Sequence, residues 1–275
     1  MGTATTIRRS VYADRLRDFA AFAFGDEAAF GNRGRWGEFF RRRLGAGFDG
    51  RVICEVGCFD AALLGRVAAR HPNTGFVGLD WKCKAVYDGA KRVAGLGLQN
   101  VALVRGRGQD VLKIFAEGEV AEAWVFHPDP CDRDVELKNR LIGEAFLGDV
   151  YKALRDDRSV LSLKTDHPGY YQWVLALFGL AEPAWFRAPR TSQGQGATPG
   201  PRLRARDLMR DDDLPAASDA IRRQFDVAMN SADYWGDPAA IAHTSGRCFA
   251  GEVTMFEERF LRRREPIYYF EVRKR

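Results

Sequence analysis

The sequence predicts an α/β protein built on an open, doubly wound, mostly parallel sheet of seven strands. From residue 51 onward, short apolar runs alternate with stretches of helical periodicity, which is the rhythm of strand–helix–strand units. The runs are also continuously apolar rather than alternating, as expected of strands that helices cover on both faces. The closing strand, Ile267–Val272, has the aromatic and β-branched composition typical of a sheet.

Residues 1–48 are expected to form helices. Tyr12–Phe24 has apolar residues at helical spacing, and Trp36–Leu44 repeats the pattern. Arginines gather beside these stretches, at Arg33, Arg35, Arg41, Arg42 and Arg43. A solvated helix face is the simpler interpretation of this cluster, and a lid or phosphate-binding surface is the functional one.

Five strands then alternate with five helices. The expected strands are Val52–Val56, Gly75–Asp80, Asn100–Arg105, Ala121–Phe126 and Ser159–Lys164, and the expected helices lie near 60–71, 84–95, 109–117, 137–154 and 169–179. Ligands of such sheets bind beyond the carboxyl ends of the strands. We therefore expect Glu55–Gly57, Asp80, Gly106 and Asp129 along one edge.

The composition changes after Leu180. Thr191–Pro201 is rich in Gly, Ser, Gln and Pro and is expected to be a loop, whereas Ser218–Asn230 is expected to be a helix with Ser218 as its N-cap. The chain therefore divides into an N-terminal helical segment, 1–48, and a main domain, 49–275, with an insertion at about 185–248. The insertion either caps a pocket or decorates the surface.

Composition and cysteine usage exclude several classes of protein. The net charge of +5 arises from 42 basic and 37 acidic residues, too mild an excess to indicate nucleic-acid binding by itself. The five cysteines form no Cys-x-x-Cys pair and no zinc spacing with histidine, so no metal site is expected. No signal peptide and no membrane-spanning run is recognised, and we expect a cytoplasmic protein.

Two motifs carry the most specific information. The first is Val-Phe-His-Pro-Asp-Pro-Cys at 125–131, directly after the fourth expected strand, and the second is Thr-Met-Phe-Glu at 254–257. Together they resemble the bacterial tRNA (guanine-N7) methyltransferases, which pair a Phe-x-Pro-Asp-Pro-Trp loop with a late Thr-x-Tyr/Phe-Glu motif. The resemblance covers roughly residues 50–180 and 250–273 and implies a Rossmann-like class I methyltransferase fold with S-adenosylmethionine as cofactor.

The resemblance implies a set of cofactor-binding residues. They are Glu55, Gly57, Asp80, Gln109, Phe126 and Thr254. A glycine lets the backbone approach a ligand closely, and an acid 25 residues after Glu55 suits the ribose hydroxyls. The family reads Glu-Ile-Gly-x-Gly-x-Gly at this turn, whereas Phe59 and Ala61 replace two glycines here. Arg107 replaces the acid that faces adenine, which leaves Gln109, Asp110 or backbone atoms near Arg107 to read that ring.

The same resemblance implies the residues of methyl transfer. Asp129 corresponds to the family's presumed catalytic acid, and prolines on both sides hold its loop rigid. His127 either shares this work or is a hydrogen-bonded structural histidine, and Glu257 belongs to the late motif as a third catalytic candidate. Asp166, Arg133 and Trp235 are the expected substrate-binding residues.

The sequence departs from the family where the tRNA should bind. Cys131 replaces the loop's Trp, and the strongly basic run that follows in the family is 132–140 here, with three acids and three bases. A run without net charge cannot neutralise phosphates, which dominate nucleic-acid affinity. We therefore expect a small planar nitrogen heterocycle as the methyl acceptor. A tRNA (guanine-N7) methyltransferase that binds RNA through the N-terminal arginines is the alternative, and a catalytically silent binding module is the second.

Overall fold

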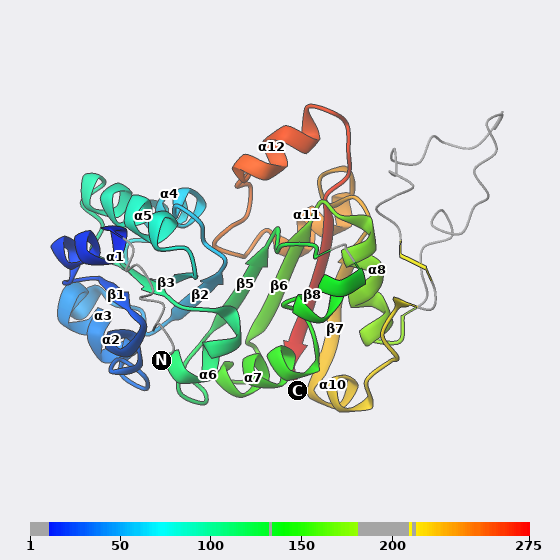
Figure 1. The fold of residues 1–275 in the computed structure, drawn as a ribbon, viewed down its shortest axis with the longest axis horizontal. Helices are drawn as coiled ribbons and strands as arrows, with labels where there is room; N and C mark the ends of the chain where they lie inside the picture. Colours follow the sequence, from blue (N-terminus) through cyan, green and yellow to red (C-terminus); the bar gives the residue numbers. More distant parts are fainter. Residues whose placement is uncertain (1–10, 132–133, 181–208, 211–212) are drawn as a thin grey trace, which may run out of the picture. The chain divides into compact units, whose positions relative to one another are not determined.

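The computed structural model of the protein describes residues 11–131, 134–180, 209–210 and 213–275 (Figure 1). The chain forms two compact units, Met1–Phe115 and Ala116–Arg275. Strands and helices alternate along each unit, and the predicted class, a Rossmann-like α/β fold with a mostly parallel sheet, is confirmed. The described residues hold eight strands rather than the seven predicted.

The first unit contains four parallel strands in the order β1-β4-β3-β2. These strands are β1 (Ala23–Gly25), β2 (Val52–Val56), β3 (Gly75–Asp80) and β4 (Val101–Arg105). Its helices are α1 (Val11–Arg15), α2 (Asp26–Phe30), α3 (Trp36–Leu44), α4 (Ala62–Arg70), α5 (Cys83–Gly95) and α6 (Val111–Ile114). Every residue of β2 and β3 is buried, which accounts for the continuous apolar runs in the sequence.

Aromatic side chains from α3 pack the N-terminal segment onto this sheet. Trp36 and Phe40 are fully buried, and the Trp36 indole donates to the Ile114 carbonyl at 2.9 Å. Gly75 has to be a glycine because a Cβ there would lie 2.3 Å from the Phe40 ring. The aromatic residues of Trp36–Leu44 are therefore core residues.

The second unit contains the strand order β5-β6-β8-β7. Its strands are β5 (Glu122–Phe126), β6 (Val160–Thr165), β7 (Phe225–Ser231) and β8 (Tyr268–Lys274), and its helices are α7 (Glu144–Ala153), α8 (Pro168–Leu177), α10 (Asp219–Gln224), α11 (Pro238–Thr244) and α12 (Met255–Leu261). β5 and β6 are parallel, whereas β8 is antiparallel to both of its neighbours. These four strands lie side by side in Figure 1.

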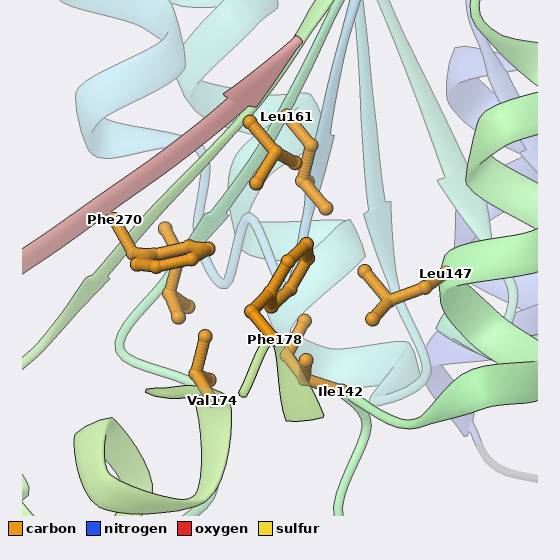
Figure 2. A pocket seen from close by; sticks show the side chains of 8 residues that line it. Ile142, Leu147, Leu161, Val174, Phe178 and Phe270 are labelled. Atoms are coloured by element: carbon orange, nitrogen blue, oxygen red, sulfur yellow. The ribbon is translucent and has the colours of Figure 1, made fainter. Parts of the chain in front are cut away.

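Side chains alternate between the two faces of β6 and β8. Leu161, Leu163, Phe270 and Val272 point toward α7 and α8 and line a small cavity whose walls are entirely apolar (Figure 2). The intervening residues are polar, and the register pairs Ser162 with Glu271 and Lys164 with Tyr269. One face is thus an apolar core and the other a row of buried polar groups.

Two predictions of local structure are wrong. Tyr12–Phe24 is not one helix: it breaks after a 3-10 turn at Leu16–Phe19, and Ala23–Gly25 becomes β1 because it can pair with the exposed edge of β4. Ser218 does cap a helix, accepting from Ile221 N at 3.3 Å, but that helix ends at Gln224 and β7 follows. Ile221, Phe225 and Met229 are four residues apart, and an even spacing fits a strand's alternation as well as a helix.

Candidate active site

The turn between β2 and α4 keeps the backbone of a glycine-rich loop although two glycines are replaced. Gly57, Phe59 and Ala61 all have positive φ, at 85°, 49° and 54°. These are the three positions that carry glycine in the family pattern. A Cβ at Gly57 would meet nothing within 4 Å, so the backbone there is open to a ligand. The replacement of a glycine by Phe59 therefore leaves the turn in a left-handed backbone conformation.

Glu55, the last residue but one of β2, has a buried carboxyl oxygen without a partner among the described residues. The residue is 4% exposed, and its Oε2 atom has no hydrogen bond to any residue that the structure describes. Burial, reinforced by the nearby Asp80 carboxylate, raises the pKa of Glu55 to about 8. A buried acceptor without a donor is the feature that a ligand's ammonium group would satisfy.

Asp80 braces the same turn from the end of β3. Its Oδ2 atom accepts from Phe59 N at 3.1 Å and its Oδ1 atom from Lys82 N at 2.8 Å. Burial raises the pKa of Asp80 above the ordinary value, against the effect of these two hydrogen bonds. Each oxygen retains a second lone pair, so the carboxylate is oriented and still able to accept from ribose hydroxyls.

The turn after β4 leaves Gln109 exposed. It lies in the 3-10 turn Gly108–Asp110, and Asp110 next to it is engaged by Lys113 at 2.7 Å. Trp81, directly after Asp80, is 61% exposed, a feature that the motif comparison did not single out. The signal that the sequence offered for Trp81 was a tryptophan directly after the strand-ending Asp80. The exposed Gln109 side chain is accessible to a ligand, as its predicted role in binding the cofactor requires.

In the second unit, the loop after β5 holds His127 in a constrained position. Its φ is 51°, its side chain is 3% exposed, and its Nδ1 atom lies 2.9 Å from Asp166 Oδ1. Burial by itself would raise the pKa of Asp166, but the hydrogen bond and charge of His127, with smaller backbone and His167 effects, together lower it. The Nε2 atom of His127 has no partner among the described residues. The structure thus pairs two predicted site residues that lie 39 positions apart.

Asp129 lies at the exposed tip of this loop. Its Oδ1 atom accepts from Cys131 N at 3.2 Å, which closes a short turn around Pro130. Phe126, by contrast, is 7% exposed and packs over Lys164, so its ring belongs to the buried layer beneath the loop. Asp129 is therefore accessible to a substrate, and Phe126 supports it.

Glu257 is fully buried and holds the late motif in place. It forms a capping box with Thr254, accepting from Thr254 N at 2.6 Å while the Thr254 hydroxyl accepts from Glu257 N at 3.0 Å. Its other oxygen accepts from Lys164 Nζ at 2.9 Å and from Trp235 Nε1 at 3.2 Å. Glu257, Thr254 and Trp235 are therefore bonded to one another within the protein, and the catalytic role of Glu257 stays a prediction.

Lys164 is the partner that the sequence comparison missed. It is 1% exposed, and four aromatic rings surround its ammonium group, the nearest being Tyr234 at 4.4 Å from the ring centroid. Burial lowers the pKa of Lys164. Burial alone would raise the pKa of Glu257, but the charge and hydrogen bond of Lys164, the charge of His127 and the hydrogen bond from Thr254 N together lower it. A lysine inside an apolar strand was the available signal, but its partner lies 93 residues away.

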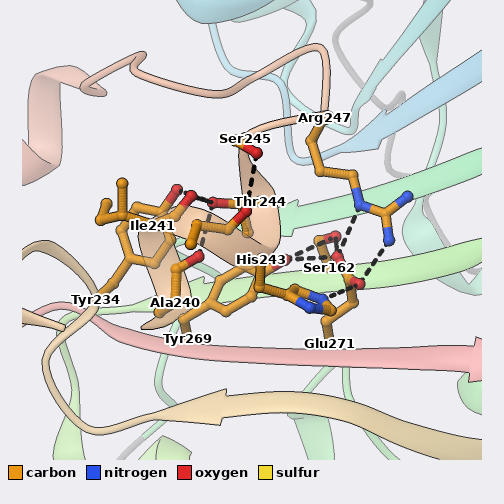
Figure 3. A network of polar contacts seen from close by, with 11 residues as sticks. Ser162, Tyr234, Ala240, Ile241, His243, Thr244, Ser245, Arg247, Tyr269 and Glu271 are labelled. Atoms are coloured by element: carbon orange, nitrogen blue, oxygen red, sulfur yellow. Dashed lines mark hydrogen bonds and ion pairs between the residues drawn. The ribbon is translucent and has the colours of Figure 1, made fainter. Parts of the chain in front are cut away.

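A second buried carboxylate anchors the described part of the insertion. Glu271 is fully buried and accepts from Arg247, from His243, from Tyr269 and from Ser162 (Figure 3). Burial alone would raise the pKa of Glu271, but the hydrogen bonds and charge of Arg247, with the hydrogen bonds from Tyr269 and His243, together lower it. α11 and the segment after it are thus tied to the polar face of β6 and β8.

The basic positions considered for RNA binding are only partly available. Arg133 lies outside the described residues. Arg140 is 6% exposed and donates to the Pro130 carbonyl at 2.8 Å, so it supports the loop rather than facing solvent. Arg43 donates to the Gln99 and Ala21 carbonyls and covers two phenylalanine rings. Arg41 and Arg42 remain exposed.

The mostly parallel sheet, the left-handed turn after β2 and the acids ending β2 and β3 define a class I S-adenosylmethionine-dependent methyltransferase fold. The chain belongs to the family described as "Putative methyltransferase", whose model matches residues 49–194, more than half of the chain. The predicted methyltransferase family and the predicted cofactor, S-adenosylmethionine, are confirmed by this match. Among the described residues, no cluster of His, Cys, Asp and Glu could hold a metal ion.

Named relatives give the comparison more detail. The chain is 34% identical over 135 residues to a tRNA (guanine-N(7)-)-methyltransferase of Cytophaga hutchinsonii, covering 49% of this chain and 58% of the relative. It is 35% identical over 155 residues to one of Porphyromonas gingivalis, covering 56% and 60%. The chain thus spans about three fifths of the length of these relatives. A solved structure of an antibiotic-related methyltransferase aligns with a TM-score of 0.49 and 12% identity, over 87% of this chain and 94% of that one.

The prediction of a small heterocyclic acceptor is wrong. The similar curated proteins include several named tRNA (guanine-N(7)-)-methyltransferases. The neutral run at 132–140 misled the prediction because the choice of acceptor rested on that one segment. No helix in the described part of the chain is long and apolar enough to cross a membrane.

Proposed function

We propose that this protein transfers the methyl group of S-adenosylmethionine to N7 of a guanine in tRNA. The observation that supports this acceptor best is the 34–35% identity to relatives named for that reaction. The accessible Asp129 loop, with Asp166 paired to His127 beneath it, supports the chemistry. We place the reaction in the cytoplasm, with 1–48 and about 185–248 as additions to the methyltransferase domain.

The first unit would hold the cofactor. The Glu55 carboxylate would receive the cofactor's ammonium group, which gives its unpartnered Oε2 atom a donor. Asp80 would accept from the ribose hydroxyls, and the open backbone at Gly57 would allow close approach. These residues fit a ligand that has one cationic end and a vicinal diol.

When bound, the cofactor supplies an electrophilic methyl group on a sulfonium, which guanine N7 takes with its lone pair while the sulfur keeps the electrons of the broken bond. N7 of guanine carries no proton, so no base has to remove one. Positive charge moves from the sulfur to the purine ring. Asp129 and Asp166 would therefore act as electrostatic stabilisers of the developing cation rather than as proton acceptors.

Labelled S-adenosylmethionine tests the proposal. Purified protein is incubated with tRNA that lacks N7-methylguanosine, and the tRNA is digested to nucleosides and separated. Label in N7-methylguanosine, absent with Asp129→Asn, is the expected result. Label in another nucleoside, or none in tRNA while the cofactor is bound, would overturn the proposed acceptor.

A further inference from the structure

Four arginines crowd onto α12 and the turn that follows it. This α12 arginine cluster consists of Arg259, Arg262, Arg263 and Arg264, all exposed. Arg262 pairs weakly with Glu258 at 3.6 Å, whereas Arg259, Arg263 and Arg264 have no side-chain hydrogen bond or ion pair within the part of the chain that the structure describes. Unpaired arginines held close together are suited to phosphate groups.

The same helix brings an aromatic ring to the acceptor half of the site. Phe256 is 43% exposed, and its ring stacks on that of His127 with centroids 5.7 Å apart. Phe256 and Arg259 lie at positions i and i+3 of α12 and share one of its faces, whereas Arg262, Arg263 and Arg264 follow in the turn after Leu261.

The helix is fixed rather than loosely attached. Glu257, between Phe256 and Glu258, is bound to Lys164 of β6, and the capping box fixes the first turn. The arginines therefore have a defined distance from His127 and Asp166. Residues 116–275 have 23 basic and 26 acidic residues, so this cluster is a local basic patch in an otherwise acidic unit.

We propose that the α12 arginine cluster binds the tRNA phosphates next to the guanine that is methylated, taking over the task of the family's lost basic run. The inference rests on the proposed function and adds to it the surface that receives the RNA. The rival surface is the N-terminal one, where Arg41 and Arg42 are exposed but Arg43 is committed to backbone carbonyls.

Salt dependence of tRNA binding measures the phosphate contacts directly. The dissociation constant is determined between 50 and 200 mM salt for the wild type and for Arg259→Gln/Arg263→Gln. Loss of two phosphate contacts should reduce the slope of log affinity against log salt by about 1.4 to 1.8. The variant's affinity should then fall about tenfold less than that of the wild type across this range.

Two matched pairs remove the same charge elsewhere. Arg222→Gln/Arg223→Gln changes exposed residues of α10, which lies where β7 begins, and Arg41→Gln/Arg42→Gln changes the rival surface. Both should keep the wild-type slope, and Arg259→Lys/Arg263→Lys should keep most of it. Should Arg259→Gln prevent folding, Arg263→Gln/Arg264→Gln beyond the helix end is measured instead.

The inference is overturned if the α12 pair keeps the wild-type slope, or if either matched pair lowers it equally. Unchanged affinity for S-adenosylmethionine in every variant confirms that the site itself is intact. A wild-type protein that neither binds nor methylates tRNA would instead overturn the proposed function. The two failures are therefore distinguishable.

Discussion

Asp129 is the residue whose role the structure makes most testable. It is exposed, and its hydrogen bonds to residues that the structure describes stay within its own loop, so replacing its charge should leave folding unchanged. Asp129→Asn should lower kcat for tRNA roughly a hundredfold, the scale of losing one stabilising group in a preorganised site. Single-turnover kinetics and the melting temperature measure the two effects. Asp157→Asn, also exposed, is the control, and equal activity of both variants would contradict the assignment.

Glu55 should make cofactor binding depend on pH. Its pKa of about 8 in the fold exceeds the ordinary value of 4.5, so the protonated form predominates at neutral pH. The contribution of Glu55 to the free energy of unfolding is full below pH 4.5 and is lost as pH rises from there through about 8. An ammonium group needs the carboxylate, so binding must release this proton. The dissociation constant for S-adenosylmethionine should therefore fall about tenfold per unit between pH 5.5 and 7.0. Calorimetry measures it.

The matched variant for this pH dependence is Glu55→Gln, which cannot titrate. It should bind more weakly, with an affinity that does not change over the same range. A wild-type dissociation constant that is constant between pH 5.5 and 7.0 would show that the Glu55 proton does not couple to the cofactor.

At the scale of elements, the β2–α4 turn keeps a left-handed backbone although its residues are no longer all glycines, so the effect of that backbone on stability can be measured. Phe59 has a left-handed backbone and is 40% exposed. A side chain costs about 1 kcal/mol in that conformation, so Phe59→Gly should be about 1 kcal/mol more stable than Phe59→Ala. Denaturant unfolding measures the difference. In α4, Ala62→Gly should instead destabilise, and the same sign at both positions would contradict the turn geometry.

The Lys164–Glu257 pair determines how firmly α12 is attached. Lys164→Met leaves a buried carboxylate without its cation, which should cost about 3 kcal/mol of unfolding free energy. Lys164→Met/Glu257→Gln removes both charges and should recover most of that loss. Because Phe256 and Arg259 lie on α12 and the other three arginines follow it directly, KM for tRNA should rise more than kcat falls. A double variant no more stable than the single one would argue against charge pairing as the cause.

For the molecule as a whole, the parallel strands could be predicted because burial on both faces makes them continuously apolar. Phe225 and Ala23 were assigned to helices because strand pairing with β8 and β4 depends on partners distant in sequence. The predicted cofactor residues Glu55 and Asp80 lie at the carboxyl ends of strands, a position that can be read from the sequence, and their role in binding the cofactor stays a prediction. Lys164 and the α12 arginine cluster were not predicted as site residues. Lys164 contacts Glu257, and α12 contacts His127, across large separations in the sequence.

The two ligands should leave separate marks on the whole molecule. The proposed cofactor residues lie in residues 1–115 and the α12 arginine cluster in 116–275. A ligand at a hundred times its dissociation constant adds about 2.7 kcal/mol to the folded state, enough to slow amide exchange through opening up to about a hundredfold. Hydrogen exchange with each ligand alone should therefore show S-adenosylmethionine protecting residues 55–61 and tRNA protecting 255–264. β7 serves as the internal reference, and cofactor protection confined to the second unit would contradict the assignment of Glu55 and Asp80.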